Sequence, residues 1–195
     1  MLANLRALFG VFVDIMFLRR GPEQLPPSRL LLAIMAIVHV AAHSITDRIF
    51  IAPLLPAPAP VLPGNVVAAF VMMIWFRIAL QLAGKPERFV QTMIAVFFIG
   101  LVTVIMKPLE AAMVPTMLAA QASTQAAAEA AAAQVPAAVV LIASIGVFWV
   151  FAMLARVVKS AFEWGWGPAI SFVLLSVFGV PLLLGVIFAG GAKPA

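Results

Sequence analysis

Five stretches of about twenty residues, almost free of charged side chains, constrain this chain of 195 residues more than any other feature. A helix needs about 20 mainly apolar residues to cross a hydrocarbon layer of about 30 Å. The chain is 65% apolar and 10% charged, whereas about a quarter of the residues of a soluble domain are charged. The sequence therefore excludes a soluble globule and predicts an all-α, polytopic membrane helix bundle with about five transmembrane helices.

Apolar windows and turn residues divide the chain into three parts. Residues 1–28 are predicted to be a cytoplasmic segment, in which an amphipathic interfacial helix over 2–18 precedes a hinge rich in proline and glycine. A transmembrane domain over 29–190 and an external tail over 191–195 follow. The five predicted spans are 29–46, 65–83, 88–106, 136–155 and 168–189.

Local signals mark several of these boundaries. Ser28 stands directly before the first apolar run and is the expected N-cap of the first span. Gly84, with Pro86 two residues later, is the expected stop of the second span. The third span is expected to end at Lys107 and Pro108.

Two further segments are predicted to lie outside the bilayer on the external side. Prolines are frequent over 52–64, which favours an extended, polyproline-like loop without internal hydrogen bonds. Residues 111–134 are rich in alanine but contain several polar side chains, so we expect a surface or interfacial helix there.

The basic residues are distributed unevenly about the predicted spans. Nine of the twelve fall on the side of the N-terminus and three on the opposite side. Because cytoplasmic segments are enriched in Lys and Arg, we expect a multi-pass membrane protein with a cytoplasmic N-terminus and a C-terminus on the external side. The nine are Arg6, Arg19, Arg20, Arg29, Arg77, Lys85, Arg88, Arg156 and Lys159, and the three are Arg48, Lys107 and Lys193.

Polar side chains in or beside the spans are the candidates for function, and three of them share one helix. His39 and His43 are four residues apart, so they lie on one helical face, and Asp47 continues that stripe. Two interpretations stay open. The imidazoles either make hydrogen bonds that hold helices together, or they handle protons or a metal ion, since ionisable groups inside a membrane are functional candidates.

Arg77 is the remaining candidate, and it lies inside the second predicted span near its cytoplasmic end. One interpretation is a side chain that extends to the lipid headgroups, as long basic side chains near helix ends do. The other is contact with an anion or a substrate.

Other sites are not indicated by the sequence. The basic residues form no stripe or tail that would bind nucleic acid. The chain has no cysteine and no phosphate-binding, zinc-protease, serine-hydrolase or dinucleotide motif. We therefore expect no catalytic residue, no cofactor and no metal site, and the expected partners are the lipid bilayer and another membrane protein.

Two segments resemble those of a known group. FLRRGPEQLPPS (17–28) and RFVQTMIAVFFIG (88–100) resemble recurring signatures of a family of small, uncharacterised proteobacterial inner-membrane proteins. The layout of a short cytoplasmic helix and five spans also resembles the Yip family of membrane proteins, which implies a membrane organiser without catalysis. The first resemblance implies the bacterial inner membrane, with the C-terminus in the periplasm. From the basic N-terminal helix, the proline-rich loop and the absence of catalytic motifs, we expect a non-catalytic scaffold or accessory subunit for another membrane or envelope protein. The alternative is a small transporter or channel subunit with a proton or cation relay through His39, His43 and Asp47.

Overall fold

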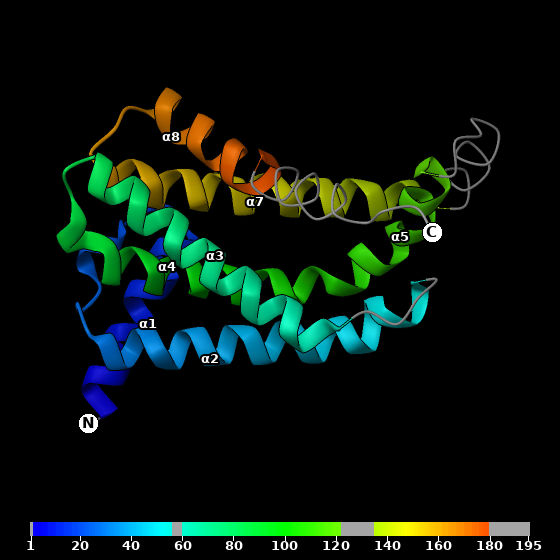
Figure 1. The fold of residues 1–195 in the computed structure, drawn as a ribbon, viewed down its shortest axis with the longest axis horizontal. Helices are drawn as coiled ribbons and strands as arrows, with labels where there is room; N and C mark the ends of the chain where they lie inside the picture. The colour runs from blue at the N-terminus through cyan, green and yellow to red at the C-terminus, as the bar shows by residue number, and fades with distance from the viewer. Residues whose placement is uncertain (1, 56–59, 122–134, 180–195) are drawn as a thin grey trace, which may run out of the picture.

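The structure is a computed structural model that describes residues 2–55, 60–121 and 135–179. Within these ranges the chain is built of helices and contains no strand, which confirms the predicted all-α bundle (Figure 1). Short 3-10 and π turns join or extend the longer helices. These longer helices are α1 (Leu2–Met16), α2 (Arg29–Thr46), α3 (Val61–Leu82), α4 (Phe89–Thr103), α5 (Lys107–Gln121), α7 (Ala137–Phe162) and α8 (Trp166–Leu174).

Among the described residues, four helical segments are long and apolar enough to cross a membrane. The fifth predicted span, 168–189, is described only as far as residue 179, where it forms the shorter apolar helix Trp166–Gly179. The predicted tail 191–195 lies outside the described residues. The four long segments are Arg29–Leu54, Val61–Leu82, Pro86–Pro115 and Ala137–Phe162.

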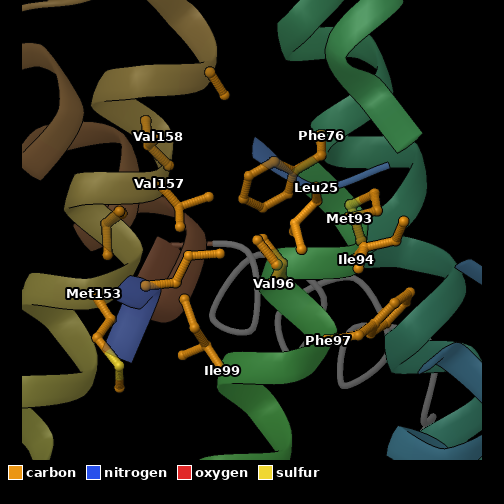
Figure 2. Close-up of a cluster of buried hydrophobic side chains, with 14 of the residues drawn as sticks. Leu25, Phe76, Met93, Ile94, Val96, Phe97, Ile99, Met153, Val157 and Val158 are labelled. Atoms are coloured by element: carbon orange, nitrogen blue, oxygen red, sulfur yellow. The ribbon is translucent and has the colours of Figure 1, made fainter. Parts of the chain in front are cut away.

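The central helix of the bundle is α4, which packs against α1, α2, α3 and α7. Its residues 92–97 are buried, so almost every side chain in that stretch touches a neighbouring helix. Such all-round burial is typical of an apolar helix in the middle of a bundle. Figure 2 shows the core that results, with side chains that include Phe76, Met93, Phe97, Met153 and Val157.

Two of the predicted helix boundaries are confirmed by their hydrogen bonds. The hydroxyl of Ser28 accepts from the backbone N–H of Leu31 at 3.2 Å, and α2 begins at the next residue, Arg29. At the end of α3, Gly84 has a φ of 69°. The N–H of Gly84 bonds to Gln81 O and that of Lys85 to Leu80 O, which is a Schellman motif.

The helical rod of α2 is longer than predicted, because it continues through a π turn at Asp47–Ile51 and a 3-10 turn at Ala52–Leu54. In the π turn the N–H of Ala52 bonds to the carbonyl of Asp47, five residues back. The predicted loop 52–64 is correspondingly wrong at its start. It is also wrong at its end, since α3 begins at Val61 and has Pro63 in its first turn, where the missing N–H costs nothing.

The third span does not stop at Pro108 as predicted. Proline has no N–H to bond to the carbonyl of Val104, four residues back. A 3-10 turn at Val104–Met106 solves this problem, because the N–H of Lys107 bonds to the Val104 carbonyl instead. The chain therefore stays helical into α5, which covers the first half of the predicted segment 111–134, while residues 122–134 lie outside the described part.

The fourth span is also longer than predicted, since α7 runs to Phe162 rather than to residue 155. Val157, Val158 and Ala161 continue its buried face, so the helical periodicity does not end at the basic residue Arg156. Glu163 then ends the helix in a left-handed conformation, with a φ of 57°.

The N-terminal helix α1 packs on the bundle by one apolar face. Phe12 and Ile15 are buried, and the Phe12 ring stacks on Phe98 of α4 with centroids 4.3 Å apart. The indole N–H of Trp149 in α7 donates to the carbonyl of Met16 at 3.0 Å. This helix is therefore held by α4 and α7, while Phe9 is exposed.

Candidate functional site

The bundle has two ends that differ in their polar groups. We call the end where α3 meets α4 and α7 meets α8 the Glu163 end, and the opposite end, where α4 continues into α5, the Lys107 end (Figure 1). His39, His43 and Asp47 follow one another along α2 and its π turn toward the Lys107 end. Arg77 lies near the Glu163 end of α3, so the structure brings together three of the four candidates.

The two histidines pack against the turn of α4 that contains Gly100. Their ring centroids are 4.5 Å apart. The Nε2 atom of His43 lies 2.9 Å from the carbonyl oxygen of Gly100, and because a carbonyl only accepts, this nitrogen is the donor. A β-carbon at position 100 would collide with the ring of His39. Glycine at this position therefore lets α2 and α4 approach closely.

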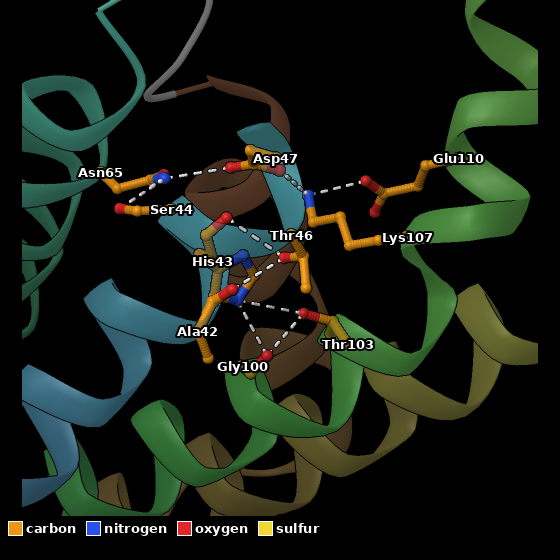
Figure 3. A network of polar contacts seen from close by, with 10 residues as sticks. All are labelled: Ala42, His43, Ser44, Thr46, Asp47, Asn65, Gly100, Thr103, Lys107 and Glu110. Atoms are coloured by element: carbon orange, nitrogen blue, oxygen red, sulfur yellow. Dashed lines mark hydrogen bonds and ion pairs between the residues drawn. The ribbon is translucent and has the colours of Figure 1, made fainter. Parts of the chain in front are cut away.

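Asp47 is the centre of a polar network that joins three helices (Figure 3). One carboxylate oxygen accepts an ion pair from Lys107 of α5 at 2.9 Å, and the other accepts from the side-chain amide of Asn65 in α3 at 3.0 Å. Lys107 also pairs with Glu110 at 2.7 Å, and Asn65 also donates to Ser44 at 3.3 Å. The network thus connects the end of α2 to the starts of α3 and α5.

An apolar cavity of about 570 Å³ lies beside the histidines. Its wall is formed by α2, α3, α4, α7 and α8 with the turn that follows it, and His39 is its one titratable lining residue among those described. The indole N–H of Trp75 donates to Ser176 across this wall at 2.8 Å. Other lining residues are Val71, Phe76, Val96 and Ile99.

A second cavity, of about 690 Å³, lies at the Lys107 end. Asp47, Lys107 and Glu110 line it, together with Asn65 and apolar side chains. Gly64 lines both cavities, so the apolar cavity and the charged cavity meet at this residue. The arrangement offers an apolar space and a charged space side by side, which suits binding more directly than bond-making chemistry.

Arg77 has separate contacts at the Glu163 end. Its guanidinium donates to the carbonyl of Pro86 at 3.2 Å and lies over the ring of Phe89, 5.4 Å from the centroid. The side chain is exposed and bonds to the loop that begins after α3. These contacts fit the interpretation of a basic side chain that extends to the end of its helix.

The Glu163 end has its own ion pairs. Glu163 accepts from Lys85 at 2.5 Å and pairs with Arg88, and Arg88 also donates to the carbonyl of Ser160 at 2.8 Å. The hydrogen bond from Lys85, with the nearby Arg88 guanidinium, holds the pKa of Glu163 below its ordinary value. The side chain of Ser160 donates to Glu23 at 2.6 Å, which ties the hinge to α7.

Sequence reasoning missed Asn65, Gly100, Thr103, Lys107 and Glu110 as members of the site. Lys107 was expected to end a span, and Glu110 follows that expected end, so neither was paired with Asp47. One signal was present, because Lys107 and Glu110 are three residues apart with opposite charges, the spacing of a helical ion pair.

The chemistry of a metal site is not supported by the arrangement of these side chains. Within the described ranges no three His, Cys, Asp or Glu side chains are grouped closely enough to hold an ion. His43 already bonds to the carbonyl of Gly100. Asp47 already bonds to Lys107 and to Asn65. Their observed contacts join helices.

Comparisons with protein-family models, with curated proteins and with solved structures find no match to this chain. The resemblance to small proteobacterial inner-membrane proteins and to the Yip layout therefore stays a prediction. The function has to be argued from the contacts, the cavities and the charges of the bundle.

Proposed function

We propose that this protein is a non-catalytic accessory subunit or scaffold of the bacterial inner membrane that binds another membrane or envelope protein. In this proposal the Glu163 end faces the cytoplasm and the Lys107 end faces the periplasm. The orientation rests on the excess of basic residues at the Glu163 end, where Lys85, Arg88 and Lys159 lie close to one another in the loops and the last turns of α7.

The observation that supports binding over transport is the closed packing of the half near the Glu163 end. Leu80 is fully buried there, as are Met93, Ile94 and Val157 (Figure 2). The charged cavity lies at the Lys107 end, and the apolar cavity ends against this core at Phe76, Val96 and Val173. Because the apolar cavity ends against a packed core, it favours binding of a partner over transport of a solute through the bundle.

The polar groups support the same proposal, because they hold the bundle together. Asp47, Lys107 and Asn65 bond to one another, and His43 bonds to the α4 backbone. Hydrogen bonds of this kind stabilise helix association in membranes by roughly 1 kcal/mol each. A rigid bundle is a suitable platform for a partner, and its function needs no titrating group.

The test is purification of the full chain from membranes of its own host in mild detergent, with a photo-crosslinking amino acid at one exposed position at a time. Ile37 on α2 and Phe148 on α7 are 69% and 75% exposed and serve as the two positions. We expect one protein to co-purify reproducibly and to crosslink from one of the helices only. Lipid adducts alone from both positions, with no co-purified protein, would refute the proposal.

A second candidate, a proton or cation relay, is favoured by one observation. The ring of His39 lies beside that of His43. His43 lies 3.5 Å from the Thr103 hydroxyl, and the Asp47–Lys107 pair lies nearby (Figure 3). Such a chain of groups is typical of proton paths in membranes.

Flux into proteoliposomes distinguishes this candidate from an accessory subunit. A relay predicts a proton or cation flux that is lost when His39 and His43 are both replaced by glutamine. An accessory subunit predicts no flux above that of empty vesicles, with either the natural chain or the double variant.

A further inference from the structure

The apolar cavity and the charged cavity share one lining residue. This is Gly64, in the first turn of α3. A β-carbon built at Gly64 has no atom of the protein within 4 Å, so no side chain fills the space beside this glycine. An occupant of one cavity can therefore extend into the other past this glycine.

The charged cavity has an excess of negative charge. Its charged lining residues are Asp47, Glu110 and Lys107, and two carboxylates against one ammonium leave a formal charge of −1. Lys107 and Asp47 are shielded, with 12% and 18% of their side chains exposed, whereas 49% of the Glu110 side chain is exposed. Lys107 contacts only one oxygen of Glu110, so this exposed carboxylate can still accept a second cation.

We propose that these two cavities bind one amphiphile that has an apolar body and a single positive charge. The apolar body lies between α3, α4 and α7 beside His39, and the charge lies near Glu110 and Asp47. This ligand site goes beyond partner binding, and it does not depend on the accessory function proposed above.

Size and chemistry favour a compact lipophilic cation. The apolar cavity, of about 570 Å³, falls within the range of about 300–1,000 Å³ that is typical of pockets for drug-sized ligands. Aromatic faces at Trp75 and Phe76 line it, and such faces attract cations as well as apolar groups. The carboxylates of Asp47 and Glu110 in the charged cavity favour a positive charge on the ligand over a negative one.

The experiment measures binding of decyltrimethylammonium, which has an apolar chain and one terminal positive charge, to the purified full chain in a neutral detergent by equilibrium dialysis. Decanesulfonate has the same apolar chain and the opposite charge, so it controls for simple partition into the detergent. We expect saturable binding of the cation, with one site per chain, and no saturable binding of the anion.

Two variants test the two parts of the site. Glu110→Gln removes the excess charge and is expected to weaken cation binding by about tenfold, since one charge at short range is worth at least this much at a protein surface. Gly64→Leu fills the open junction without a clash and is expected to weaken binding by a similar factor. The melting temperature of both variants is measured, so that a folding defect is distinguished from a lost site.

Gly167→Leu is the matched control, because Gly167 also lies in the first turn of a helix, also has open space at its β-carbon and lines neither cavity. It should bind the cation as the natural chain does. Equal binding of the cation and the anion would overturn the proposal. So would full cation binding in folded Glu110→Gln and Gly64→Leu variants, or an equal loss in Gly167→Leu.

Discussion

Apolar side chains join the helices in the half of the bundle near Glu163, whereas ion pairs and hydrogen bonds join them in the half near Lys107. Leu80, Met93 and Val157 are completely buried in the first half. In the second half Asp47 and Lys107 are in contact and line one cavity, and the apolar cavity shares the lining residue Gly64 with it. The first half is thus filled by packing, and the second is held by directional bonds around open space.

The backbone differs between the two halves in the same way. In the half near Lys107, α2 ends in the π turn Asp47–Ile51, and α4 passes into α5 through the 3-10 turn Val104–Met106. In the half near Glu163, α3 and α7 stay α-helical to their C-caps, and the 3-10 turns Pro22–Gln24 and Pro86–Arg88 lie in the connections between helices. Irregular turns within long helices are frequent at functional sites. The half near Lys107 is therefore the one that carries the ligand site proposed above.

The largest expected effect is a loss of stability when the ion pair in the half near Lys107 is broken. Lys107→Met leaves the partly buried Asp47 carboxylate without its cation and near Glu110, which should lower the free energy of unfolding by about 2–3 kcal/mol. Asp47→Leu combined with Lys107→Met should recover most of that loss, since no unpaired buried charge remains. Unfolding in a graded SDS titration measures both variants. A single variant as stable as the natural chain would show that this pair does not hold α2 to α5.

The next prediction compares the same substitution, valine to alanine, in the two halves. Val157 is fully buried in the packed half, whereas Val67 lines the apolar cavity and is 56% exposed. Val157→Ala should lower the free energy of unfolding by about 2 kcal/mol, through lost contacts and a new void. Val67→Ala should change it by no more than about 0.5 kcal/mol. The same titration compares the two variants. Equal losses would mean that the two halves are packed alike.

Two helical glycines make a third comparison of filled and open space. A β-carbon at Gly100 meets the His39 ring, so Gly100→Ala should destabilise the protein by about 1–3 kcal/mol. Gly64→Ala meets nothing and should stabilise it by up to about 1 kcal/mol, because alanine favours helix. Thermal unfolding in detergent checks the sign of each change. A gain in stability for Gly100→Ala would contradict the close approach of α2 and α4.

The smallest expected effect is the pH dependence of the Glu163 ion pairs. Because Lys85 and Arg88 lower the pKa of Glu163 from its ordinary value of 4.5, its contribution to stability is complete above that value. This contribution is lost as the pH falls through the lowered pKa. The difference in melting temperature between the natural chain and Glu163→Gln should therefore be constant at neutral pH and vanish in acid. High salt should reduce it, because the carboxylate is at the surface.

Local signals predicted the fold well. Ser28 as N-cap and Gly84 as stop are confirmed, because each acts on residues within its own helix turn. Prolines were more difficult to interpret. Pro63 and Pro108 were expected to exclude helix, yet both lie in first turns, where a missing N–H is tolerated.

The site was predicted in part. The spacing of His39, His43 and Asp47 placed them on one side of α2, which the structure confirms, since the two rings are neighbours and Asp47 follows in the next turn. Their partners could not be predicted. Gly100 and Lys107 are distant in sequence, and helical periodicity says nothing about which helices cross or at what height.

The sequence by itself determined that this protein is an all-helical bundle with several helices long enough to cross a membrane, because apolar length and caps act locally. Only the tertiary structure decided that Asp47 pairs with Lys107, that Gly100 admits His39, and that two cavities meet at Gly64. Those features depend on how helices from distant parts of the chain cross. Crossing is set by the packing of whole helix faces, which no single segment specifies.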